Sequence, residues 1–216
     1  MCDAPILYSF RRCPYAMRAR MALQASGTPY VHREIVLRDK PRAMLDVSLK
    51  GTVPVLVLPG GTVIDESIDI MHWGLAQHDP ENWLARHDEA LVAEFDGPFK
   101  HHLDRYKYAE RYDVDPFVHC AAGLAILADL GARLTRRKYL GGTERGFTDV
   151  AIFPFVRQFA AVDADWFGEH ASPSLRDWLW RLVTSALFER AMVRFPTWVQ
   201  DQDGADEDLM PTSASR

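Results

Sequence analysis

The chain has 216 residues, 48% of them hydrophobic and 25% charged, a composition typical of a globular protein with one large or two modest domains. The net charge of −5 is concentrated after Gln200, and the near-neutral remainder argues against the basic face that nucleic-acid binding needs. The sequence has no signal-peptide pattern and no recognised apolar run near ~20 residues, so we expect no membrane span and a cytoplasmic location.

Residues 1–78 alternate between strand and helix patterns. Short apolar runs predict strands at 5–10, 30–37, 53–58 and 62–65, and helices are expected at 14–26, at 41–48 and from 67 onward. This order is βαβ, a short helix, then ββα, which fits a four-stranded mixed sheet covered by helices. The polar segment 79–82, with its proline, is the predicted linker to the rest of the chain.

Residues 83–200 predict a second, all-helical domain. A helical pattern over 83–108 should kink or break at Gly97-Pro98. The strongly apolar run 116–134 is expected to be the central helix, and another helix is expected at 174–190. The acidic segment 201–216 is expected to be a mobile tail.

The first candidate site is Cys13, which directly precedes Pro14 at the start of a predicted helix. Proline suits the first helical turn, and unpaired N–H groups and the positive end of the helix dipole gather there. Together with Arg11, Arg12 and Arg18, these features should favour a thiolate and lower the pKa of this thiol. Because Ala16 stands where a dithiol motif has its second cysteine, the site is a one-thiol nucleophile.

Two further motifs follow in the same domain. Pro54 lies at the start of an apolar strand, where proline cannot donate to the ladder and marks a special geometry. Asp65-Glu66-Ser67 lies at a strand-to-helix junction. There the hydroxyl and free N–H groups can hold a carboxylate, and the Glu66 carboxylate can accept from an ammonium group. Simple capping by Ser67 is the alternative interpretation.

The turn Cys13-Pro14-Tyr15-Ala16 after an apolar strand resembles the active-site turn of glutaredoxins and other thioredoxin-fold proteins. The whole chain, to about residue 198, resembles a cytosolic glutathione S-transferase, nearest to the cysteine-type bacterial members (omega-like or glutaredoxin-2-like). The resemblance implies an α/β thioredoxin-like domain at 1–78 followed by an all-α domain at 83–200.

The resemblance also implies roles for individual residues. Val53 and Pro54 would form a cis peptide that faces Cys13, with the Val53 backbone pairing with the cysteinyl part of glutathione. Glu66 and Ser67 would hold its γ-glutamyl end, and Lys40 its glycine carboxylate. Residues that would contribute to a pocket for a small electrophile are Tyr15, Phe99 and Tyr106.

Other candidate residues receive a structural interpretation. Asp149 matches the aspartate of a family capping box whose hydroxyl position is Gly146 here, so we expect a structural role and a less stable helix start. Neighbouring helical positions point about 100° apart, which makes His101 and His102 a poor metal pair. The three cysteines have no zinc spacing and form no disulfide framework, Cys120 being an expected buried thiol. We therefore expect no metal.

Three functions remain open at this point. The first is a glutathione-dependent thiol transferase that uses Cys13 through a glutathione mixed disulfide. The second is glutathione conjugation to electrophiles, with Ser9 or Tyr8 activating the glutathione thiol. The third is a non-catalytic binding or regulatory protein with a transferase fold. Candidate partners are glutathione, a small electrophile or mixed-disulfide substrate, and a second copy in a homodimer.

Overall fold

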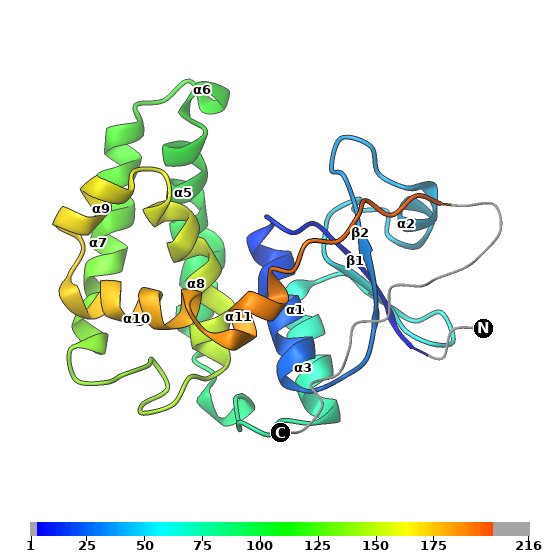
Figure 1. The fold of residues 1–216 in the computed structure, drawn as a ribbon. Helices are drawn as coiled ribbons and strands as arrows, with labels where there is room; N and C mark the ends of the chain where they lie inside the picture. Colours follow the sequence, from blue (N-terminus) through cyan, green and yellow to red (C-terminus); the bar gives the residue numbers. More distant parts are fainter. Residues whose placement is uncertain (1–3, 201–216) are drawn as a thin grey trace. The chain divides into compact units, whose positions relative to one another are not determined.

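The computed structural model describes residues 4–200, which form two compact units (Figure 1). The first unit contains residues up to Glu81 together with those from Ala186 onward, and the second contains Asn82–Ser185. The first is an α/β unit with one sheet, and the second is helical. The acidic segment 201–216, Cys2 and the mobile tail expected from the sequence lie outside the described residues.

The first unit is built on a four-stranded mixed sheet, as the sequence predicts. The strand order is β2-β1-β3-β4, with β1 parallel to β2 and antiparallel to β3, and β3 antiparallel to β4. The strands are β1 (Ile6–Ser9), β2 (Val31–Glu34), β3 (Val55–Val57) and β4 (Val63–Ile64). This is the thioredoxin-like arrangement of strands expected from the β-strand and helix order.

The two faces of this sheet bury different side chains because successive strand residues point to opposite sides. Leu7 is paired with Leu56, and both pack with residues of the helices α1 (Pro14–Ala25) and α3 (Ser67–Gln77). Tyr8 is paired with Val55, and both pack with Met44 of the short helix α2 (Arg42–Val47). The sheet therefore has a buried apolar layer on each side.

The end of the described chain completes the first unit rather than the second. The helix α11 (Ala186–Ala191) packs against α1. Farther on, the Phe195 ring stacks on His32 at 4.4 Å, and the Trp198 N–H donates to the Glu34 carbonyl at 2.7 Å. The sequence reading assigned the whole of 83–200 to one helical domain and missed this return, because periodicity identifies a helix but not its packing partner.

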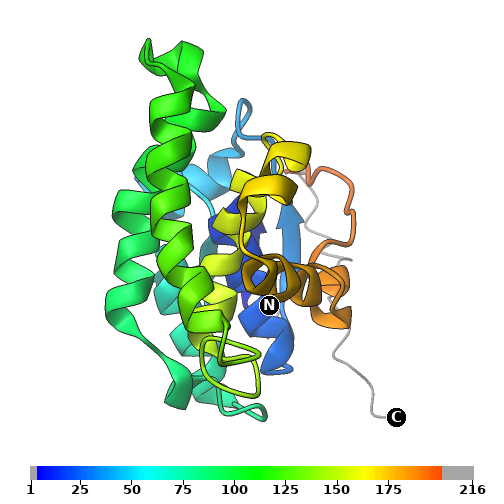
Figure 2. The same cartoon turned by 90° about the vertical axis from the view of Figure 1, so that its left-hand side faces the viewer.

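The second unit is a bundle in which α5 and α7 run side by side (Figures 1 and 2). Its buried helix α8 contacts α5 and α10. In chain order the elements are η1 (Leu84–Arg86), α4 (Glu89–Glu94), η2 (Phe95–Phe99), α5 (Lys100–Lys107), α6 (Ala109–Tyr112), α7 (Pro116–Leu134), α8 (Phe147–Ala160), α9 (Ala164–His170) and α10 (Pro173–Val183). The short helix α9 was not predicted.

Gly97-Pro98 produces neither a break nor a gap in the helical path. Residues Phe95–Phe99 form a π-helical turn that joins α4 directly to α5. A π turn accommodates the missing N–H of proline by shifting the hydrogen-bond ladder locally, and such turns are rare. Phe95 and Phe99 are fully buried on this turn, with ring centroids 4.6 Å apart.

The helix α7 occupies the predicted range 116–134. By length and composition alone it would be long enough to cross a membrane, which the sequence reading did not recognise. One such helix is weak evidence for a membrane span, and α7 packs against α5 and α10 within the second unit. Cys120 on this helix is buried, as expected, and burial raises the pKa of its thiol.

The start of α8 confirms the structural interpretation of Asp149. Its buried carboxylate accepts hydrogen bonds from four donors: the backbone N–H groups of Leu140, Gly141 and Gly146, and the Trp178 indole. A Cβ added at Gly146 would lie 2.5 Å from the Arg86 Cβ and 3.1 Å from the Arg86 carbonyl oxygen. The glycine at the family's hydroxyl position is therefore required by the close approach of Arg86.

Candidate functional site

Cys13 lies at the N-terminus of α1, as the sequence predicts. It occupies the N-cap position, and Pro14 begins the helix. The Cys13 backbone N–H donates to the Phe10 carbonyl at 3.0 Å, which closes the turn after β1. The side chain is half-buried, and Cys13 makes no side-chain capping hydrogen bond to α1. The thiol thus lies at the positive end of a twelve-residue helix dipole.

The second motif lies directly against this thiol. The Val53–Pro54 peptide bond is cis, as the resemblance implies. The Cys13 Sγ donates to the Val53 carbonyl oxygen at 3.6 Å, across 40 positions of the chain. Pro54 is buried just before β3, so its missing N–H removes no bond from the described ladder. The Val53 backbone and the Cys13 sulfur are therefore direct neighbours in the first unit.

The start of α3 provides the third motif. Ser67 is the first residue of this helix and is buried, and its hydroxyl accepts a hydrogen bond from the Arg18 Nε at 3.0 Å. Arg18 is also buried, so it links α1 to the start of α3. A buried guanidinium beside free helical N–H groups is a favourable environment for a carboxylate. The sequence reading had assigned Arg18 only to the surroundings of Cys13.

Glu66 and Asp65 interact with a lysine that the sequence reading did not single out. The Lys50 Nζ lies 2.6 Å from a Glu66 carboxylate oxygen and 3.0 Å from an Asp65 carboxylate oxygen. Asp65 also accepts from the Ser48 hydroxyl at 3.0 Å. The hydrogen bond from Lys50 is the main reason why the pKa of Asp65 is lowered. An incoming ammonium group would share the Glu66 carboxylate with Lys50.

The remaining predicted site residues lie in different places. The half-buried Lys40 has its Nζ 3.7 Å from an ideal Cβ on Gly51, two positions before Val53. The Tyr15 ring lies beneath the Arg18 guanidinium, 5.0 Å from its centroid. Phe99 has no exposed surface and packs against Phe159 in the core of the second unit, so it offers no surface for a ligand here.

Tyr106 also belongs to the aromatic core of the second unit. Its ring lies 5.0 Å from that of Phe159, and the side chain is half-buried. Burial is the main cause of a raised pKa at Tyr106, and a hydrogen bond with Cys120 adds to it. This phenol is therefore held in its neutral form.

The two hydroxyls considered for activating glutathione are engaged inside the first unit. Ser9 is fully buried and accepts from the Arg20 Nη1 at 2.5 Å. Tyr8 is 3% exposed, and its hydroxyl accepts from the Arg33 Nη1 at 2.6 Å. Because both side chains are buried, these hydroxyls are poorly placed to reach a glutathione thiol.

Arg20 is a second residue of the first unit, besides Lys50, that the sequence pattern does not single out. It is buried, its Nη2 donates to the Arg11 carbonyl, and its Nε donates to the Ala191 carbonyl, both at 2.8 Å. Burial lowers the pKa of Arg20, and its interactions with Tyr30 and Glu34 oppose that change. Arg20 therefore holds the loop between β1 and Cys13 in place through the Arg11 carbonyl. An arginine amid small and apolar helix residues was the signal available in the sequence.

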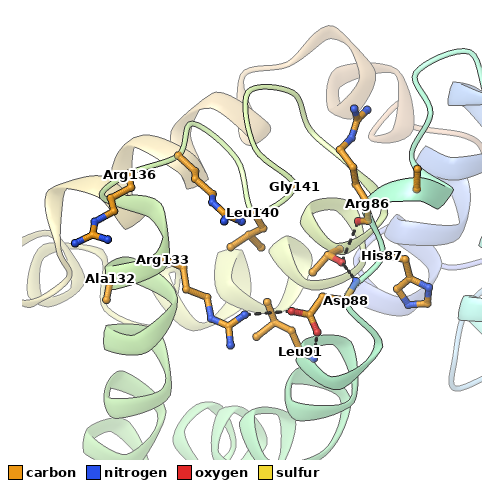
Figure 3. Close-up of a pocket in the computed structure, with 12 residues that line it drawn as sticks. Arg86, His87, Asp88, Leu91, Ala132, Arg133, Arg136, Leu140 and Gly141 are labelled. Atoms are coloured by element: carbon orange, nitrogen blue, oxygen red, sulfur yellow. Dashed lines mark hydrogen bonds and ion pairs between the residues drawn. The ribbon is translucent and has the colours of Figure 1, made fainter.

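The second unit contains a separate cavity of about 660 Å³ (Figure 3). Its lining includes the four arginines Arg86, Arg133, Arg136 and Arg137, together with Asp88 and Thr148. Arg133 donates to Asp88 at 3.1 Å, and Figure 3 shows Arg136 pointing away from that pair. All residues of this lining belong to the second unit, and none is a predicted site residue.

Comparison with known families matches both units. Residues 7–83 match the family Glutathione S-transferase, N-terminal domain, and residues 81–181 match Glutathione S-transferase, C-terminal domain. These two matches are adjacent and together span most of the chain. The protein therefore belongs to the glutathione S-transferase family.

Relatives with curated names are consistent with this family. The chain is 32% identical to pyrimidodiazepine synthase of Drosophila melanogaster over 162 residues, which is 70% of this chain but only 63% of that relative. It is 25% identical to glutathione S-transferase omega-1 of Rattus norvegicus over 181 residues, covering 80% of this chain and 74% of the relative.

Solved structures of the family share the fold. Glutathione transferase Omega 3C from Trametes versicolor superposes with a TM-score of 0.74 at 20% identity, covering 88% of this chain and 85% of that chain. A glutathione transferase family member from Pseudomonas fluorescens pf-5, solved with two glutathione molecules bound, gives 0.73 at 19% identity, covering 88% and 92%.

Proposed function

We propose that this protein is a glutathione-dependent thiol transferase of the cysteine type, with Cys13 as its nucleophile. The observation that carries this proposal is the 3.6 Å contact between the Cys13 Sγ and the carbonyl oxygen of Val53. A glutathione cysteinyl residue that pairs with the Val53 backbone would have its sulfur beside Cys13. Family membership and the relative named glutathione S-transferase omega-1 support the use of glutathione as a substrate.

The proposed reaction has two balanced thiol–disulfide exchanges. The Cys13 thiolate attacks the glutathionyl sulfur of a mixed disulfide R–S–S–G. A Cys13–glutathione disulfide forms, the S–S bond of the mixed disulfide breaks, and RS⁻ leaves with the electron pair and takes a proton from water. A second glutathione thiolate then attacks the glutathionyl sulfur, which yields oxidised glutathione and regenerates the Cys13 thiolate. The N-terminus of α1 stabilises the negative sulfur in both steps.

Binding of glutathione is assigned to three groups of the first unit. The Ser67 hydroxyl, the first N–H groups of α3 and the Arg18 guanidinium lie together and favour the γ-glutamyl carboxylate. Glu66 accepts from the γ-glutamyl ammonium, in competition with Lys50. Lys40 binds the glycine carboxylate. Tyr15, beside Arg18, is the proposed contact with the second substrate.

The conjugation alternative is less favoured because Ser9 and Tyr8 are buried and accept hydrogen bonds from arginines. The non-catalytic alternative does not explain why a half-buried thiol lies at a helix N-terminus. We also propose a cytoplasmic location, where glutathione is abundant and thiols stay reduced, and a homodimer. Cell fractionation and sedimentation velocity test these two proposals.

The deciding experiment is intact-protein mass spectrometry after incubation with oxidised glutathione. We expect one glutathione adduct on the wild-type chain, on Cys2→Ser and on Cys120→Ser, and none on Cys13→Ser. An adduct that persists in Cys13→Ser contradicts the assignment of the nucleophile. Glutathione binding without any adduct would favour conjugation, and the absence of binding would favour a non-catalytic role.

A further inference from the structure

Three histidines converge in the second unit, where α5 and α7 run side by side (Figure 2). His101 and His102 belong to α5, and His119 belongs to α7. One ring nitrogen from each residue can be chosen so that all three lie within 4.8 Å of one another. The sequence reading considered only the adjacent pair and did not include His119, which comes 17 positions after His102.

The closest contact in this cluster joins the two helices. The Nδ1 atoms of His102 and His119 lie 2.9 Å apart. Two protonated ring nitrogens cannot share that contact, so at least one presents a lone pair. Neutral imidazole is the form that binds transition metals.

Arg105 now supplies the positive charge at this cluster. Its Nη1 donates to the His101 Nδ1 at 3.0 Å, so that nitrogen also presents a lone pair. The same guanidinium lies over the Tyr112 ring, 4.5 Å from its centroid. If a metal ion replaced the Arg105 guanidinium at His101, Arg105 would still have its contact with the Tyr112 ring.

We propose that His101, His102 and His119 form a binding site for a divalent transition metal of the zinc type. Tetrahedral zinc with Zn–N bonds of about 2.0–2.1 Å places its ligand nitrogens about 3.4 Å apart. The cluster reaches that spacing by side-chain rotation, because its nitrogens already lie within 4.8 Å. The all-nitrogen donor set suits zinc, copper and nickel, whereas calcium and magnesium prefer oxygen ligands.

The coordination would leave one position of a tetrahedral zinc for water or another ligand. The neighbouring Cys120 thiol is buried and hydrogen-bonded with Tyr106, and it does not belong to the histidine cluster. Since two ligands come from α5 and one from α7, bound metal would cross-link these helices and stabilise the second unit. This inference is independent of the thiol-transferase proposal, because the cluster and Cys13 belong to different units.

The test is isothermal titration of chelator-treated protein with zinc sulfate in a buffer without glutathione. A Cys2→Ser/Cys13→Ser background removes two thiols that would themselves bind zinc. We expect one site per chain, at least 10-fold weaker binding in His119→Ala and in His101→Ala, and unchanged binding in His170→Ala. His170 is a matched control because it is an exposed histidine of the same unit, on α9.

Two further measurements distinguish ligation from a general effect on folding. Cobalt titration should give visible bands without a thiolate charge-transfer band, which excludes Cys120 as a ligand. Arg105→Leu should bind zinc more tightly, by roughly threefold or more, because it removes the competing cation; a merely damaged fold would bind less tightly. Absence of zinc binding up to millimolar concentrations, or equal binding in His119→Ala and His170→Ala, would overturn the proposal.

Discussion

The starts of α1 and α8 are built in opposite ways. At α8 the Asp149 carboxylate is buried and accepts four hydrogen bonds, and Arg86 fills the space beside Gly146. At α1 the cap residue is Cys13, which makes no side-chain capping bond and is half-buried. A helix start whose donors are used by protein groups stabilises the fold, whereas one left accessible can stabilise an anion.

The largest effect should come from removing the accessible sulfur. Cys13→Ser should reduce thiol transfer by roughly 10³-fold, equivalent to about 4 kcal/mol, because an alcohol does not form the nucleophilic anion at neutral pH. The melting temperature should change little, because serine is similar in size to cysteine and its hydroxyl can still donate to the Val53 carbonyl. Reduction of a glutathione mixed disulfide measures the activity, with Cys120→Ser as control. Retained activity in Cys13→Ser would contradict the claim that the accessible start of α1, unlike that of α8, serves the reaction.

The second effect tests the buried cap. Asp149→Ala should lower the free energy of unfolding by about 3 kcal/mol or more, because it leaves buried N–H groups without an acceptor. The exposed cap Asp163, which accepts from the Trp166 N–H at 2.9 Å, is the matched control, and Asp163→Ala should cost about 1 kcal/mol. Urea denaturation measures both values. Equal losses in the two variants would contradict the structural role of Asp149.

A third, smaller effect concerns the glycine of the same cap. Gly146→Ser restores the hydroxyl of the family motif, yet its Cβ would lie 2.5 Å from the Arg86 Cβ. We expect a net loss of about 1–2 kcal/mol, because overpacking costs more than a cap bond contributes. Gly168→Ser is the control, since a Cβ there meets nothing within 4 Å. A gain in thermal stability for Gly146→Ser would show that Arg86 moves aside without cost.

The smallest effect concerns the start of α3. This helix start is intermediate in kind between the accessible start of α1 and the start of α8, whose donors are used by protein groups. Lys50 lowers the pKa of Asp65, so this interaction stabilises the fold above the unfolded-state pKa and is lost as the pH falls through the folded-state pKa. Lys50→Met should move the pKa of Asp65 back toward its ordinary value and reduce the acid dependence of stability. Carboxyl NMR titration measures this pKa, with Lys40→Met as control. An unchanged pKa in Lys50→Met would contradict the pairing.

The sequence predicted features that depend on local chemistry. The Cys13–Pro14 helix start, the four strands and the full extent of α7 follow from short-range patterns, and the structure confirms them. The cis Val53–Pro54 peptide came from the family resemblance, because a strand-opening proline alone does not distinguish cis from trans.

Features that depend on distant contacts were not predictable in the same way. Arg20 bonds to Ala191, 171 positions away, and no local pattern encodes that partner. The need for glycine at Gly146 appears only when Arg86 packs against it. The His119 contact with His102 depends on how α5 and α7 align. The helical period indicates that each helix exists but does not give this alignment.

The return of residues 186–200 to the first unit has a consequence for synthesis on the ribosome. The strand β2 and the buried Arg20 acquire their last partners only after the entire second unit has been made. A nascent fragment ending at residue 81 would expose His32 and the Arg20 side of α1 to solvent and to other chains. The α/β unit, although it comes first in the chain, can therefore complete its contacts only after the second unit has been synthesised.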